Sequence, residues 1–199
     1  MAIAQELRVP YPDYHEEVFM DMDFEQNLFT PEVPAELQNT ISDYMVKTAN
    51  SIKIPNTSVD IMRESDVIAV TIPSDELFLP NDTLLDRNAD KYLSKLIPLM
   101  KDPYMYKVLV SVHSDDTGSN EYLSTLTDLR QNSIYEWLLN QIDNGKLSED
   151  LVIIPFAMGN SEYLMDNDTR ENRRENRRVE FYFIPGPKLM EMARFNKLK

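Results

Sequence analysis

The order of apolar and polar positions predicts strands that alternate with helices from residue 58 onward. Apolar and polar residues alternate over 58–61 and 67–71, which predicts two short strands joined by a turn. Continuous apolar runs predict three further strands, at 108–112, 152–157 and 179–184. Apolar residues spaced by threes and fours predict helices over 34–51, between Thr83 and Met100, and over 119–142. We therefore expect an α/β fold in which helices cover one face of a single sheet.

The start of the chain differs from the rest in charge and in proline content. Residues 1–60 carry 11 acidic and 3 basic residues, so −8 of the net charge of −14 lies there. Prolines at positions 10, 12, 31 and 34 interrupt any long early helix. We expect residues 1–57 to form an acidic, mostly extended arm with one helix, residues 58–186 to form the folded domain, and residues 187–199 to form a basic tail.

Composition narrows the classes of function. With 199 residues, 42% of them hydrophobic, the chain is long enough for one folded domain with an attached segment. A net charge of −14 would repel a phosphate backbone, so nucleic acid is not an expected partner. The chain has no cysteine and only 2 histidines, which leaves few ligands for transition metals. We expect neither a metal nor another cofactor.

The ends of the chain bear on where the protein acts. No stretch approaches the ~20 consecutive apolar residues of a transmembrane helix. Ala2-Ile3-Ala4, before Gln5, has the small-x-small form of a signal-peptidase site, as expected of an exported protein whose leader has been removed. An ordinary start in a cytosolic protein fits this feature equally well.

An arginine interrupts the apolar stripe of the predicted helix 119–142. The stripe consists of Tyr122, Leu126, Arg130, Ile134, Trp137 and Leu138. An arginine is seldom fully buried without a partner. Arg130 either lies along the helix edge and pairs with a carboxylate at the rim of the core, or it faces a cleft. Asp115 follows the strand 108–112 directly, so its carboxylate is a candidate partner.

A second group of arginines precedes the last strand. Five of them fall within nine residues, at positions 170, 173, 174, 177 and 178. The first three, interleaved with glutamates at helical spacing, are typical of an exposed helix face. Arg177 and Arg178 open a strand, where successive side chains point to opposite faces, so one of them can reach the cleft.

The residues give little support for an enzyme. Alternation places Ser111, His113 and Asp115 on one side of a strand. A nucleophile, a base and an orienting acid must converge in space, and proximity in sequence does not provide that geometry. Hydrolysis at Ser111 and His113 is a remote alternative, and we expect a protein that is not an enzyme.

Three sequence blocks resemble the OmpA-like C-terminal domain of outer-membrane porins, peptidoglycan-associated lipoproteins and flagellar stator proteins. In that family a strand ends in GHTDxxG, the next helix carries LSxxR, and a later segment reads NDTxxGRxxNRRV. The corresponding blocks here are VHSDDTGS at 112–119, LTDLR at 126–130 and NDTRENRRENRRV at 167–179. The resemblance covers about residues 58–185 and implies a β-α-β-α-β-β two-layer sandwich, a mixed sheet covered by helices, with the acidic N-terminal segment as an extension.

The resemblance also implies a ligand, the diaminopimelate of the peptidoglycan stem peptide, bound without covalent chemistry. Its distal centre carries an ammonium, which the family binds at the position of Asp115, and a carboxylate, which it binds at the position of Arg130. Ser114 keeps the hydroxyl of the family threonine, Arg177 matches the first arginine of NRRV, and Asn81 lies where a polar ligand contact is common. The implied location is the periplasm, in association with the outer membrane.

One departure from the family pattern leaves an alternative open. Leu123 stands where the family usually has an asparagine that contacts the ligand. Leu123 either borders the cleft or packs in the core. The expected function is to tether an envelope component to the cell wall, and the acidic arm could bind another envelope protein. The alternative is a protein-interaction module on the same fold that has lost cell-wall binding.

Overall fold

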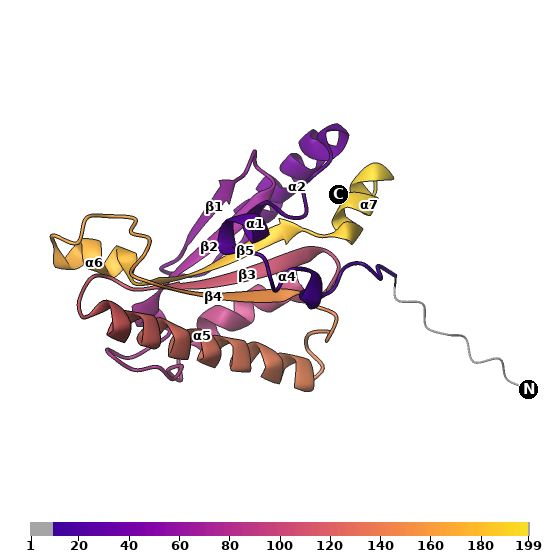
Figure 1. Ribbon diagram of the computed structural model, residues 1–199. Helices are drawn as coiled ribbons and strands as arrows, with labels where there is room; N and C mark the ends of the chain where they lie inside the picture. The colour runs from indigo at the N-terminus through magenta and orange to yellow at the C-terminus, as the bar shows by residue number, and fades with distance from the viewer. Residues whose placement is uncertain (1–9, 199) are drawn as a thin grey trace, which may run out of the picture.

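The computed structural model describes residues 10–198, which fold around one five-stranded sheet (Figure 1). The strands lie in the order β1-β2-β5-β3-β4, and only the β3–β4 pair is parallel, so the sheet is mixed as expected. The strands are β1 (Ser58–Met62), β2 (Val67–Pro73), β3 (Tyr106–His113), β4 (Ile153–Gly159) and β5 (Arg178–Pro185). The predicted strands are all present, and β1 adds an edge strand to the four of the expected sandwich.

The helices are more numerous and shorter than the sequence predicts. The α-helices are α1 (Phe24–Phe29), α2 (Gln38–Ser51), α3 (Asp90–Leu93), α4 (Ile97–Met100), α5 (Asn120–Asp143), α6 (Arg170–Asn176) and α7 (Pro187–Arg194). The 3-10 helices are η1 (Glu16–Val18), η2 (Ala35–Leu37), η3 (Ser74–Glu76) and η4 (Ser94–Leu96). Only α2 and α5 match predicted helices closely.

The helix expected after Thr83 begins later and is broken into three pieces. Asp82 accepts hydrogen bonds from the backbone of Thr83 and Leu84, and Asp86 accepts one from the backbone of Asn88. Such side-chain bonds compete with helix formation, so the chain stays in a loop until Asp90. Pro98 lies in the first turn of α4 and separates it from η4.

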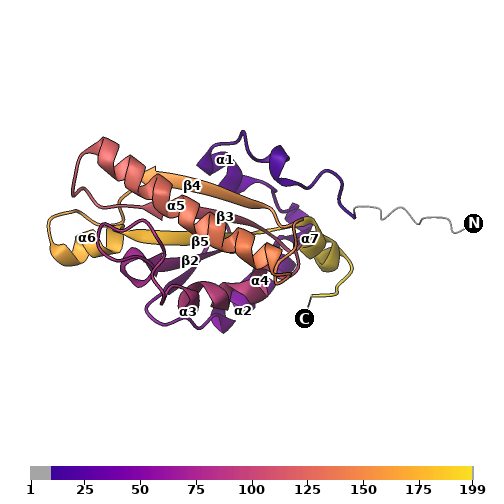
Figure 2. The same ribbon diagram turned by 90° about the horizontal axis from the view of Figure 1, so that it is seen from below.

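Both faces of the sheet are covered, which corrects the expectation that helices cover one face only. One face packs against α2, α3, α4, α5 and α7, and in Figure 2 α5 crosses in front of the strands. The other face packs against residues 11–28, with Tyr14 and Phe19 buried on it. Strand β3 is therefore buried along its whole length.

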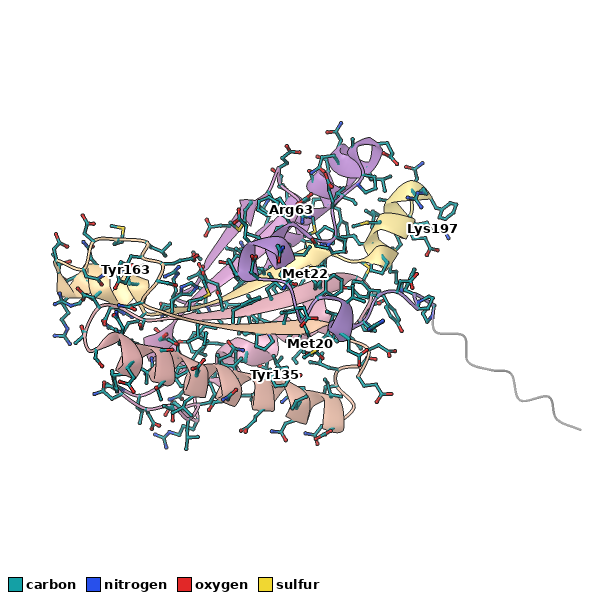
Figure 3. The ribbon with its side chains drawn as sticks, viewed as in Figure 1. Met20, Met22, Arg63, Tyr135, Tyr163 and Lys197 are labelled. Carbon is teal, nitrogen blue, oxygen red and sulfur yellow. The ribbon has the colours of Figure 1, made fainter. Side chains whose placement is uncertain are left out.

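The N-terminal segment is thus a packed layer and not a mostly extended arm. Phe24 of α1 lies 5.3 Å from the Phe156 ring and 5.6 Å from the Tyr182 ring, centre to centre. Arg63, in the β1–β2 turn, donates from Nη1 to the carbonyls of Leu28 and Pro31, and Figure 3 shows it beside α1. From this point the term arm is restricted to residues 10–33.

The C-terminal segment also differs from the expected basic tail, because residues 187–194 form α7 with Leu189 and Ala193 buried. Gly186 allows this turn: a Cβ atom there would lie 2.4 Å from the carbonyl oxygen of Tyr104. Helix α7 lies at one end of the sheet and α6 at the other (Figure 1). The Ala2-Ile3-Ala4 motif lies outside the described residues.

Candidate functional site

Asp115 lies at the end of β3, where the chain turns toward α5. The residue is 4% exposed, and its carboxylate accepts two hydrogen bonds: from the Thr117 backbone at 2.8 Å and from Nη1 of Arg177 at 2.7 Å. Burial alone would raise the pKa of this carboxyl, but the hydrogen bonds from Arg177 and Thr117 hold it below its ordinary value. Asp115 is therefore a buried, ionised carboxylate.

The turn after Asp115 depends on a glycine and a helix cap. Gly118 has φ +140°, and a Cβ atom there would lie 2.8 Å from the Tyr122 ring. Ser119 caps α5, its hydroxyl accepting from the Tyr122 backbone at 3.2 Å.

Arg130 lies on the buried side of α5 and is 5% exposed. Its Nε donates to the carbonyl of Asp82 at 2.9 Å, and its guanidinium lies over the ring of Phe78, 4.8 Å from the ring centre. Within residues 10–198 no carboxylate forms an ion pair with Arg130, and its Nη1 has no hydrogen-bond partner. Burial lowers the pKa of Arg130, with the charge of Arg177 acting in the same direction, yet a guanidinium stays charged.

This arrangement decides between the two possibilities left open for Arg130 and excludes its candidate partner. It does not lie along the helix edge, and Asp115 is not its partner, since Asp115 pairs with Arg177. The backbone carbonyls of the loop 79–82 and the Phe78 ring compensate its burial instead. That leaves one guanidinium nitrogen available to an anion.

Arg177 and Arg178 point to opposite sides of the sheet, as alternation predicts. Arg177 reaches Asp115 with Nη1 and reaches Asp75 with Nε and Nη2, at 3.4 and 3.3 Å. Arg178 is 3% exposed and lies 3.1 Å from Glu180 on the other side. Arg170, Arg173 and Arg174 lie on α6, as expected.

The other two predicted site residues differ in exposure, since Ser114 is buried and Asn81 is exposed. Ser114 is 2% exposed, and its hydroxyl donates to the carbonyl of Gly159 at 2.8 Å, which ties β3 to β4. Asn81 is exposed in the loop before α3, with φ 59°, and accepts from the Tyr122 hydroxyl at 3.3 Å. The loop that carries Asn81 is the one that Arg130 holds.

Leu123 is 1% exposed and packs in the core beneath the turn at Gly118, so it does not border a cleft. The inward stripe of α5 is shifted by one residue at its start, because Tyr122 is 43% exposed. Of the two interpretations of Leu123, the structure supports packing.

Sequence reasoning missed Asp75 and Phe78, which both contact arginines of the site. They follow β2, whose last residue Pro73 pairs with Arg178 in the antiparallel register with β5. The end of β2 and the start of β5 therefore lie at the same edge of the sheet. Predicting this pairing of β2 with β5 would have placed Asp75 near Arg177. A groove of about 480 Å³, lined in part by Asp75, Phe78 and Leu79, adjoins the site.

The serine and histidine of β3 do not form a catalytic arrangement. Nε2 of His113 lies 2.9 Å from the Ser111 hydroxyl and also 2.9 Å from Glu180, so one ring nitrogen serves both groups. A triad needs the serine and the acid on different ring nitrogens. Although burial alone would raise it, the His113 hydrogen bond and the Arg178 charge hold the pKa of Glu180 at about 2. The cluster is a buried hydrogen-bond network around the Arg178–Glu180 ion pair.

Across residues 10–198, no three histidine, aspartate or glutamate side chains are grouped closely enough to hold a metal ion. None of the helices in this part of the chain combines the length and the apolar character needed to span a bilayer.

Comparison with solved structures identifies the fold. A MotB-like protein from Desulfovibrio vulgaris superposes with a TM-score of 0.61 at 22% identity, over 75% of this chain and 96% of that one. The periplasmic domain of Helicobacter pylori MotB gives 0.50 at 19% identity, over 70% and 88%. The chain has the OmpA-like fold.

Another OmpA-like relative in structure is the cell wall anchor of the T6SS from Pseudomonas aeruginosa, with a TM-score of 0.53 at 20% identity, over 73% of this chain and 96% of that one. No protein-family model and no curated protein matches the sequence. The similarity to known proteins is therefore a similarity of fold. The arm precedes residues 58–185, the part of the chain that the sequence resemblance covers.

Proposed function

We propose that this protein binds peptidoglycan without covalent chemistry, through the diaminopimelate of the stem peptide, and so tethers an envelope component to the cell wall. One observation carries the proposal: Asp115 and Arg130, each over nine-tenths buried, stand at the same end of the fold with opposite charges that do not neutralise each other. A ligand centre with an ammonium and a carboxylate side by side matches this pair.

The remaining predicted residues fit supporting roles. Nη1 of Arg130 offers a donor to the ligand carboxylate, and the loop with Asn81 is held in place by the same guanidinium. Ser114 fixes the strand that carries Asp115. A solved structure with this fold is described as a cell wall anchor, which supports the same function for this chain. Such a function places the protein in the periplasm, in association with the outer membrane.

A protein-interaction module that has lost wall binding remains the second candidate. Two observations favour it. Leu123 replaces a family asparagine and is buried. Arg177 already donates a hydrogen bond to the carboxylate of Asp115. The arm presents exposed acidic side chains, among them Asp13, Glu17 and Asp21, which could contact a basic region of another envelope protein.

Co-sedimentation with purified diaminopimelate-type sacculi separates the two candidates. We expect the full chain to pellet and Asp115→Asn to lose roughly two to four decades of affinity, because losing one member of a desolvated charge pair costs about 3–5 kcal/mol. Asp116→Asn, an exposed neighbour, is the matched control. Asp115→Asn is preferred to Arg130→Ala, since Arg130 also anchors the loop 79–82.

Competition tests the chemistry of the ligand. Free diaminopimelate should displace sacculi, whereas lysine should not, because lysine has the side-chain ammonium without the distal carboxylate and leaves Arg130 unpaired. Equal competition by lysine would remove the role proposed for Arg130. Failure of the parent protein to pellet would favour the interaction module.

A further inference from the structure

Arg177 lies between the carboxylates of Asp115 and Asp75. Its Nη1 donates to Asp115 at 2.7 Å, while Nε and Nη2 face Asp75 at 3.4 and 3.3 Å. We propose that Asp75 is a positioning residue that retains Arg177 when a ligand ammonium takes its place at Asp115. The inference rests on the proposed function and deepens it.

In the proposed complex, the ligand ammonium binds the same carboxylate as the Arg177 guanidinium. Oδ1 of Asp115 already accepts from the Thr117 backbone, and Oδ2 accepts from Arg177. Each carboxylate oxygen can accept a second hydrogen bond, so an incoming ammonium either shares an oxygen with one of these donors or takes the place of Arg177. A guanidinium that loses its partner without replacement costs free energy, because its charge is then less well compensated.

Asp75 is placed to provide that replacement. The backbone N–H of Ser74 donates to the carbonyl of Arg177 at 2.9 Å, and Ser74 is 1% exposed, so the two segments are held together at the backbone. Asp75 faces the edge of the guanidinium opposite to the nitrogen that meets Asp115. Arg177 can therefore release Asp115 and keep an ion pair.

The charge network continues outward from Asp75. Arg174 lies 3.6 Å from Asp75 and 3.7 Å from Glu76, and its side chain is 53% exposed. Asn56 donates to Glu76 at 3.1 Å. Glu76 thus shares the charge network but does not contact Arg177, which makes it a matched control for Asp75.

Calorimetric titration of the full chain with free diaminopimelate tests the inference. Asp75→Asn keeps the size of the side chain and removes its charge, and we expect affinity to fall about three- to fivefold, the upper part of the range for a half-exposed charged pair. Asp75→Glu, which keeps the charge, should recover most of the loss. Glu76→Gln removes the same charge one residue away and should bind within about twofold of the parent.

A double-mutant cycle distinguishes action through Arg177 from a general effect of charge. In an Arg177→Gln background, Asp75→Asn should have no further effect on affinity. An equal loss in both backgrounds would overturn the inference, and so would an Asp75→Asn variant that binds like the parent. If the parent itself binds neither diaminopimelate nor sacculi, the proposed function is overturned together with the inference, so the two failures are distinguishable.

Discussion

At the scale of single residues, Leu123 decides how closely this site follows the family pattern. It is 1% exposed on the inward side of α5, below the Gly118 turn. We predict that Leu123→Asn lowers the melting temperature by about 5–15 °C, because losing a buried leucine costs about 2–5 kcal/mol and each ~1 kcal/mol shifts a domain of this size by about 2–4 °C. Thermal unfolding followed by circular dichroism measures this.

The same variant should gain no affinity for sacculi, because the new amide lies beneath the turn. Leu129→Asn, on the exposed side of the same helix at 46% exposure, is the control and should leave the melting temperature within about 2 °C of the parent. A stable Leu123→Asn protein with tighter binding would show that this position faces the ligand after all.

Sequence reasoning at this scale succeeds where a local rule decides the answer. Alternation along β5 is enough to separate Arg177 from Arg178, and it is a property of the strand alone. Asp75 is not predicted from the sequence, because its contact with Arg177 depends on the pairing of β2 with β5, which joins residues about a hundred positions apart. The partner of Arg130 is missed for a similar reason, since backbone carbonyls leave no trace in a side-chain pattern.

At the scale of elements, a buried lysine joins the arm to β3. Lys107 is 0% exposed, and its Nζ donates to the backbone and side-chain oxygens of Asn27 at 2.6 and 3.1 Å, 4.3 Å from the centre of the Phe19 ring. Burial, with the nearby charge of Arg63, lowers the pKa of Lys107 to about 7. An apolar strand pattern with one lysine gives no hint of this contact.

The lowered pKa makes stability depend on pH in a defined direction. An unfolded lysine titrates near ~10.4, so between pH 7 and about 10 the unfolded state binds more protons and folding stability rises with pH. The cost of burying the charged lysine is fully present below pH 7 and fades toward pH 10. We predict that the parent gains about 3–4 kcal/mol more across this interval than Lys107→Met does.

Urea unfolding at pH 7, 8, 9 and 10 measures the difference between the two proteins, and other titrating groups cancel in that difference. Lys101→Met, an exposed lysine, is the control and should follow the parent at every pH. Parallel curves for the parent and Lys107→Met would mean that Lys107 keeps its ordinary pKa in the folded protein.

The arm also shows why the elements of residues 1–57 were only partly predicted. Asp23 and Gln26 form a capping box for α1, with bonds of 2.8 and 3.0 Å, but the helix has only six residues. So short a helix is not stable alone and forms because Phe24 packs on the sheet. Prolines and acidic residues mark where long helices cannot form, and they do not reveal contacts with distant strands.

At the scale of the whole molecule, the arm completes the burial of the sheet. Strands with apolar residues on both faces, such as β2, need a layer on each side. Helices cover one face, and residues 11–28 cover the apolar half of the other, which includes Leu109, Ile154 and Tyr182. The acidic side chains Glu17 and Asp21 point to solvent from this layer. The arm is therefore apolar toward the sheet and acidic outside, which combines a structural role with an exposed charged surface.

This division of roles predicts what removal of the arm does. Deleting residues 1–31 uncovers the apolar patch and removes the packing of Tyr14 and Phe19 on it. We expect a net loss of about 2–4 kcal/mol, a melting temperature lower by about 5–15 °C and increased binding of the dye ANS. Replacing Glu17 and Asp21 with Gln and Asn in the full chain should change none of these, because exposed charges contribute little to stability. A deletion variant that melts with the parent and does not bind the dye would show that the sheet is stable without this layer.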